Sequence, residues 1–160
     1  MDILRELFAC LAIALPVGAE TFFTNPPRFL SAETTFEATG FPNPTYLYYV
    51  QIPDGIGRGI KTIEILQEEG SEAISYNPAR IAIKEANNIA FTVKLEPKKL
   101  AINFAQPLQQ SQTITIAISP YHNPLLDGIY QFRVSALPEG ENPREQFLGY
   151  ARFNFDRPDS

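Results

Sequence analysis

Cysteine, histidine, methionine and tryptophan are almost missing from this chain of 160 residues, which has one, one, one and none of them respectively. The only cysteine, Cys10, lies in an N-terminal apolar run, so the remainder has no disulfide, zinc-thiolate site or cysteine nucleophile. One imidazole, His122, and one thioether, Met1, are too few to build a copper or zinc site. We therefore expect no metal and no cofactor.

Clustered positive charge is also missing. The net charge is −5, and the basic residues are scattered singly apart from Lys98-Lys99. A protein that binds nucleic acid or an anionic membrane surface needs a basic patch to neutralise phosphates. We therefore expect neither as a partner. The chain also has no apolar run of the ~20 residues that a membrane-spanning helix requires, so we predict no membrane span in the mature form.

The first nineteen residues differ from the rest. The apolar run LFACLAIALPV is followed by Gly18-Ala19 and then by polar Glu20. Small residues just before a polar one are typical of the cleavage site of a secretory signal. The alternative is an N-terminal core helix, because acidic residues offset the positive flank that a signal usually has. We predict a signal peptide over residues 1–19, cleavage between Ala19 and Glu20, and export to the periplasm or the extracellular space.

Residues 20–160 show the pattern of a single all-β domain. Short runs rich in Thr, Ile, Val, Tyr and Phe alternate with Pro and Gly turns about every ten residues. This spacing predicts an immunoglobulin-like β-sandwich of about seven to nine antiparallel strands. We expect strands over residues 32–38, 45–52, 60–67, 89–95, 100–104, 113–119, 128–137 and 147–155.

Three runs need separate comment. In residues 113–118 isoleucines alternate with Thr and Ala, which predicts one buried and one solvated face. In residues 46–49 apolar side chains occupy both faces, which favours a strand in the middle of a sheet. Residues 77–88 fit two structures, because Asn77-Pro78 could start a helix while Ile81 and Ile83 alternate as in a strand. We favour a strand or irregular structure there.

The turn at Asp127-Gly128 leads directly into Ile129-Tyr130-Gln131-Phe132. This resembles the entry to the sixth strand of immunoglobulin-like sandwiches, with Phe132 where those domains keep a disulfide cysteine. We therefore predict a structural corner at Asp127, Gly128 and Tyr130. The Tyr130 ring should be buried, and its hydroxyl should bond a backbone group a few residues upstream.

No set of residues predicts catalysis. Ser119, His122 and Asp127 lie in or beside one turn, but no nucleophile elbow surrounds the serine. The carboxylates are dispersed and read as solvated surface charge. The tyrosines offer the one functional pattern, since Tyr46, Tyr48 and Tyr121, together with His122, could form part of a ligand-binding surface. Tyrosines in a β-sandwich are more often packing residues, and we favour that interpretation.

Three segments together resemble a known family: PPRFLSAETTF from Pro26, the Tyr-rich run that ends at Ile52-Pro53 with IKTIEILQ after it, and the closing set from Asn123 to Tyr150. The chain is similar to the exported cyanobacterial proteins grouped as domain of unknown function 2808. This resemblance implies an exported single-domain protein without an established activity or functional residues.

From the sequence we expect a binding protein, not an enzyme. An export signal, a β-sandwich and the lack of a reactive set favour a non-catalytic binding or envelope-associated interaction module. Its partner would be a protein or a glycan of the cell envelope. The alternative is an extracytoplasmic hydrolase or a carbohydrate-binding accessory domain that uses the tyrosines and carboxylates.

Overall fold

The computed structural model describes residues 18–84 and 88–158, and in these ranges the chain forms nine strands that all pair antiparallel. The predicted signal segment up to residue 17 lies outside the described residues, as do residues 85–87. The strands are β1 (Arg28–Thr34), β2 (Tyr46–Ile52), β3 (Ile60–Glu69), β4 (Tyr76–Lys84), β5 (Phe91–Glu96), β6 (Lys99–Leu108), β7 (Gln112–Pro120), β8 (Gly128–Pro138) and β9 (Gln146–Phe155).

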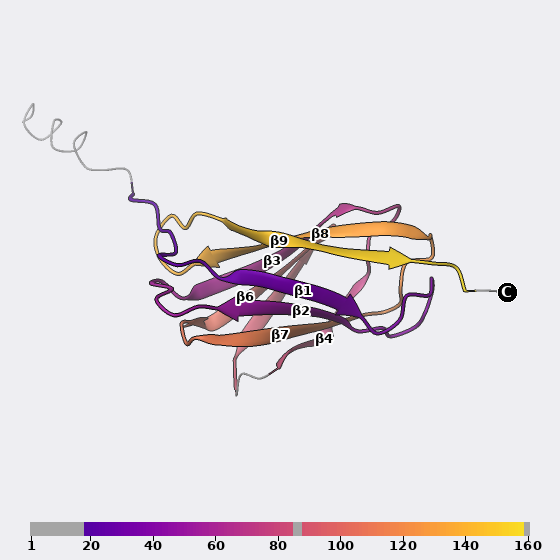
Figure 1. Cartoon of the computed structure of the whole chain (residues 1–160), viewed down its shortest axis with the longest axis horizontal. Coiled ribbons are helices and arrows are strands. Elements are labelled where there is room, and N and C mark those ends of the chain that lie inside the picture. The colour runs from indigo at the N-terminus through magenta and orange to yellow at the C-terminus, as the bar shows by residue number, and fades with distance from the viewer. Residues whose placement is uncertain (1–17, 85–87, 159–160) are drawn as a thin grey trace, which may run out of the picture.

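The strands form two sheets with the orders β1-β2-β7-β4 and β5-β6-β3-β8-β9. Figure 1 shows the two sheets packed on each other, with the strands running along the long axis of the molecule. The predicted immunoglobulin-like β-sandwich of seven to nine antiparallel strands is therefore confirmed.

Alternation along the strands builds the core between the sheets. In β2 and β7 every second side chain points inward, and the inward residues of β8 and β9 face them from the other sheet. The rings of Tyr46 and Phe153, one from each sheet, lie 5.0 Å apart. Burying a large apolar side chain contributes roughly 1.5–3 kcal/mol, so this layer stabilises the association of the two sheets.

Two of the predicted ligand-surface residues belong to this core. Tyr46 and Tyr48 are both 0% exposed, so the favoured packing interpretation is confirmed for them and the ligand-surface alternative is wrong. The reason is that β2 lies inside its sheet, between β1 and β7, with one face against the second sheet. The prediction that this strand occupies the middle of a sheet is confirmed.

The outer face of β7 also differs from the prediction. Thr115 and Ala117 were expected in solvent, but they are 2% and 7% exposed. They are short side chains on a strand that has β2 on one side and β4 on the other. In register, Thr115 lies between Tyr49 and Lys84, and Ala117 between Leu47 and Ala82.

Strand positions agree with the sequence except at three places. One is β6, which continues to Leu108 where an end at residue 104 was expected. The first strand is Arg28–Thr34 where residues 32–38 were expected, because the Thr34 hydroxyl bonds the backbone of Phe36 and turns the chain there. The ambiguous residues form β4, which pairs with β7 through an irregularity between Tyr76 and Ile81. The favoured interpretation, a strand or irregular structure, holds as far as Lys84.

The predicted corner is present. Tyr130 is 0% exposed, and its hydroxyl donates to the Leu126 carbonyl oxygen at 2.8 Å, four residues upstream. Gly128 has a φ of 129°, as expected for a glycine in the turn that starts β8. Gly70 closes the other side of the ring, because its φ is 136° and a Cβ there would overlap the Tyr130 ring.

Candidate functional site

Exposed apolar side chains gather on two loops at the end of the sandwich where β1 and β9 finish, on the right in Figure 1. The loops are residues 35–45, between β1 and β2, and residues 121–127, between β7 and β8. Leu125 is 64% exposed, Tyr121 52%, Leu126 48% and Phe36 45%. The ring of Phe36 stacks on the half-buried ring of Phe41 at 3.8 Å. We call the set Phe36, Phe41, Tyr121, Leu125 and Leu126 the apolar tip.

A buried amide ties the two loops of the apolar tip together. Asn123 is 0% exposed, and its Nδ2 donates to the carbonyl oxygens of Phe36 and Ala38 at 2.9 Å each. Its Oδ1 accepts the Tyr46 hydroxyl at 2.8 Å, and its backbone N–H donates to the Phe41 carbonyl oxygen at 2.8 Å. A core tyrosine therefore holds the position of both loops through one asparagine.

The backbone of Leu125 and Leu126 is held by a residue of a third loop. The Glu72 carboxylate, from the β3–β4 connection, accepts the backbone N–H groups of both Leu125 and Leu126. The Gly40 N–H donates to the Pro124 carbonyl oxygen at 2.9 Å, and the Leu126 carbonyl oxygen accepts the Tyr130 hydroxyl. The backbone around the two leucines is thus fixed, while their side chains point into solvent.

Burial controls the chemistry of the tyrosines that support the apolar tip. Removal from water raises the pKa of Tyr46, and nearby tyrosines raise it further. Burial is also the main reason that the pKa of Tyr130 is raised, with the Glu72 carboxylate adding to it. Any tyrosine is protonated at neutral pH, and the raised pKa keeps these two hydroxyls as hydrogen-bond donors above the ordinary pKa of 10.0 as well.

Of the four predicted ligand-surface residues, the structure places Tyr121 on the apolar tip and His122 beside it. His122 is half-buried, and its Nδ1 lies 2.7 Å from the Asn123 carbonyl oxygen. The Ser119 hydroxyl bonds that of Thr45 at 3.0 Å, and the Asp127 carboxylate lies 3.8 Å from Arg157. Ser119, His122 and Asp127 each have a different partner, so the structure does not assemble them into a triad.

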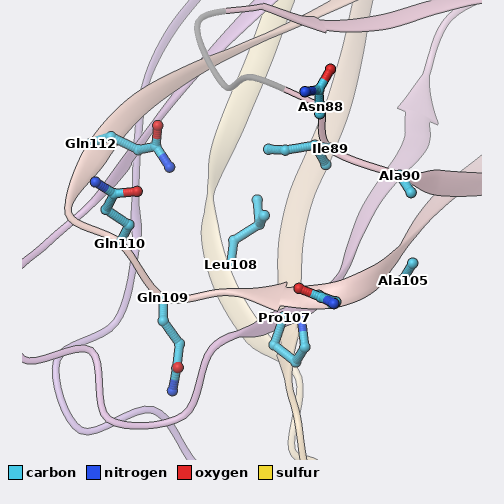
Figure 2. Close-up of a pocket in the computed structure, with 10 residues that line it drawn as sticks. Asn88, Ile89, Ala90, Ala105, Pro107, Leu108, Gln109, Gln110 and Gln112 are labelled. Carbon is cyan, nitrogen blue, oxygen red and sulfur yellow. The ribbon is translucent and has the colours of Figure 1, made fainter.

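A second site, a groove of about 690 Å³, lies at the other end of β7. It is bounded by the β6–β7 turn and by the chain that leads into β5 (Figure 2). In Figure 2 the side chains of Ile89 and Leu108 point toward its middle, and Gln112 reaches in from the β7 side. The carboxamide side chains that line it are Asn88, Gln106, Gln109, Gln110 and Gln112. We call it the amide groove.

Sequence reasoning missed the leucines of the apolar tip and the whole amide groove. The signals were present in both cases. Leu125-Leu126 is an apolar pair inside a turn, where polar residues are usual, and residues 106–112 contain four glutamines. A cluster of Phe147, Tyr150 and Arg133 on the outer face of β8 and β9 was missed as well, with the guanidinium 4.6 Å from the Phe147 ring centre.

The chain is tied into the domain from Gly18 onward, where the carbonyl oxygen accepts the Asn142 side-chain amide at 3.4 Å. The Thr21 N–H donates to the Asn142 carbonyl oxygen at 3.2 Å, and Glu20 forms an ion pair with Arg144 at 3.4 Å. Ala19 and Glu20, the predicted cleavage residues, are exposed. The prediction of cleavage itself is not tested by this geometry.

Two kinds of feature are absent from the described part of the chain. Residues 18–84 and 88–158 contain no group of three His, Cys, Asp or Glu side chains that could hold a metal ion. No helix in these ranges is long and apolar enough to cross a bilayer.

Comparison with known proteins supports the fold and identifies a family. The chain is similar to BslA, described as a bacterial hydrophobin, with 12% identity, a TM-score of 0.54, and coverage of 85% of this chain and 98% of that one. Domains D2 and D3 of the major pilin SpaD from Corynebacterium diphtheriae give 10% identity, a TM-score of 0.47, and coverage of 76% and 51%.

A cohesin module from Clostridium perfringens gives 9% identity, a TM-score of 0.39, and coverage of 83% and 100%. No curated protein matches the sequence significantly. A family model described as "Protein of unknown function (DUF2808)" matches residues 20–155. Because the match spans most of the chain, the protein belongs to this family of unknown function.

Proposed function

We propose that this protein is exported to the cell envelope and acts there as a non-catalytic binding module, docking a protein partner through the apolar tip. The observation that carries the proposal is that four large apolar side chains are about half exposed or more on loops whose backbone is fixed by Asn123 and Glu72. Exposed apolar side chains grouped on a rigid support are typical of protein interfaces.

Charge around the apolar tip suggests the chemistry of the partner. Glu37 and Asp127 lie on the two loops, and Asp156 lies beside them, since its N–H donates to the Glu37 carbonyl oxygen. All three are exposed. Two basic residues lie among these acids, because Arg157 is 3.8 Å from the Asp127 carboxylate and Arg80 donates to Asn43 Oδ1 on the 35–45 loop. A partner with an apolar centre and a rim that carries both signs of charge would complement this surface.

Two observations support export as part of the proposal. The family match starts at residue 20, directly after the predicted cleavage site. Removing residues 1–19 would take away the bond from the Asn142 side chain to the Gly18 carbonyl oxygen but keep the Glu20–Arg144 ion pair and the Thr21–Asn142 hydrogen bond, so the described sandwich would stay intact. Mass spectrometry of the native protein from the envelope fraction tests this part, and a mature N-terminus at Met1 in the cytoplasm would contradict it.

The docking proposal is tested by photo-crosslinking in cells of the native source. A photoreactive amino acid replaces Leu125 in one variant and Phe22 in a matched control. Phe22 is 60% exposed, but it lies near the β8–β9 and β2–β3 turns at the other end of the molecule. We expect a discrete crosslinked protein at Leu125 and none at Phe22.

Two other results have definite meanings. Equal crosslinking at both positions, or none at either, would refute docking through the apolar tip. The purified protein could instead adsorb to an air–water interface and lose this adsorption in Leu125→Ser. The apolar tip would then bind an apolar surface and not a protein partner. That second outcome would give the chain a property in keeping with the name of the hydrophobin that shares its fold.

A further inference from the structure

The amide groove has a lining that suits a neutral polar ligand. Among the described residues that line it none is charged, and half are Asn or Gln. Leu108, which is buried, and Ile89 form an apolar floor in the middle. Its volume of about 690 Å³ falls within the range of ligand sites. The described lining therefore offers a charged ligand no counter-ion.

Most of these amides are free to bind. Gln109 points away from the groove in Figure 2, and its Nε2 donates to the Gly57 carbonyl oxygen at 3.2 Å. The side chains of Gln106, Gln110 and Gln112 have no hydrogen-bond partner among the described residues. A carboxamide offers both a donor and an acceptor, and adjacent sugar hydroxyls need both.

We propose that the amide groove binds a neutral oligosaccharide, with the hydroxyls on the glutamines and the C–H face of a ring on Ile89 and Leu108. This would be a binding site separate from the apolar tip. It also places carbohydrate recognition away from the tyrosines, which the alternative of a carbohydrate-binding domain would have used.

An extended peptide is the competing ligand, and the strand edge disfavours it. The Ala105 N–H of β6 donates to the Ala90 carbonyl oxygen at 2.9 Å, just before β5 begins. Residues two apart in a strand direct their amides to the same side, so the next donor along this edge would come from residue 107. That residue is a proline, which has no N–H. An added peptide strand would therefore lose its pairing within the groove.

The test is an NMR titration of the purified isotope-labelled protein. The probes are cellohexaose and maltohexaose, with a neutral Gly/Ser hexapeptide as the competing class. We expect one or both sugars to shift the side-chain NH₂ signals of Gln106, Gln110 and Gln112, and the peptide to leave them unchanged. The double variant Gln110→Ala, Gln112→Ala should weaken binding at least about tenfold, because two hydrogen-bonding side chains are lost.

Asn154→Ala is the matched control, because Asn154 is an exposed amide on β9, at the opposite edge of the five-stranded sheet from β5. It should bind as the parent does. The three substituted side chains, Gln110, Gln112 and Asn154, are at least partly exposed, so the variants should fold, which their backbone spectra will show. No shift with either sugar at low-millimolar concentration, shifts with the peptide alone, or equal loss of binding in the control would each overturn the proposal.

Discussion

Replacing Asn123 with alanine tests whether one buried amide holds the apolar tip in place. The substitution removes three side-chain hydrogen bonds, to the carbonyl oxygens of Phe36 and Ala38 and from the Tyr46 hydroxyl. The backbone bond from its N–H to Phe41 remains possible. The groups left behind are part-buried or buried, so they lose their partners without regaining full hydration.

The magnitude follows from those three bonds. A hydrogen bond contributes about 1 kcal/mol net, and leaving a buried partner unsatisfied costs about 1–3 kcal/mol. The Tyr46 hydroxyl is the most buried of the three partners, and Tyr46 itself is 0% exposed. We therefore expect Asn123→Ala to lower the free energy of unfolding by about 3–4 kcal/mol. If water enters the space and bonds the two carbonyls, the loss falls toward the lower figure.

Urea unfolding followed by tyrosine fluorescence measures this change. Asn154→Ala, at an exposed position, is the control and should change stability by less than about 0.5 kcal/mol. Tyr46→Phe tests the hydrogen bond between Tyr46 and Asn123 specifically. Because both substitutions remove this bond, the double variant with Asn123→Ala should lose about 1 kcal/mol less free energy of unfolding than the sum of the two single losses. A loss below about 1 kcal/mol in Asn123→Ala would refute the view that this amide holds the loops together.

Three further predictions concern the tyrosines. Tyr130→Phe should lower the free energy of unfolding by about 1 kcal/mol, because it removes the hydrogen bond to Leu126. Tyr130→Ala should lower it by about 3–4 kcal/mol, because it also removes the buried ring. An unchanged urea midpoint in Tyr130→Ala would disprove the corner. The Tyr48 hydroxyl is buried and has no hydrogen-bond partner among the residues that the structure describes, so Tyr48→Phe should leave the unfolding midpoint unchanged or raise it, and a clear loss would reveal a partner. Burial raises the pKa of Tyr46, Tyr48 and Tyr76 above the ordinary 10.0. The unfolded chain therefore loses these protons first, so stability should be constant from neutral pH to about pH 9 and fall steeply above about pH 10 in urea titrations; a flat profile to about pH 12 would contradict this.

Local pattern was enough to predict the fold class. Strand and turn propensities depend on neighbours in the chain, and here they agreed with the tertiary structure for eight of the nine strands, with a shift at β1. The corner was predictable for the same reason, because Tyr130 bonds a carbonyl only four residues upstream. The alternation at Ile81 and Ile83 favoured a strand or irregular structure over a helix, and the structure has the strand β4 there.

The choice between buried and exposed faces could not be read from the chain. Tyr46 and Tyr49 look alike in sequence, yet Tyr46 is buried between the sheets while Tyr49 is only partly covered. Thr115 looks like a solvated residue, and its burial depends on β2 and β4 lying on either side of β7. Such burial is set by residues far away in sequence, and alternation alone does not say which strand will be flanked.

Both candidate sites were decided by tertiary structure. Leu125 and Leu126 are exposed because Asn123 and Glu72 fix the backbone around them, and these residues act across three separate loops. The amide groove needs the β6–β7 turn and the chain before β5 to meet. The sequence by itself determined which segments are strands, since that preference is local. Only the tertiary structure decided which side chains remain at the surface, because exposure depends on what the rest of the chain covers.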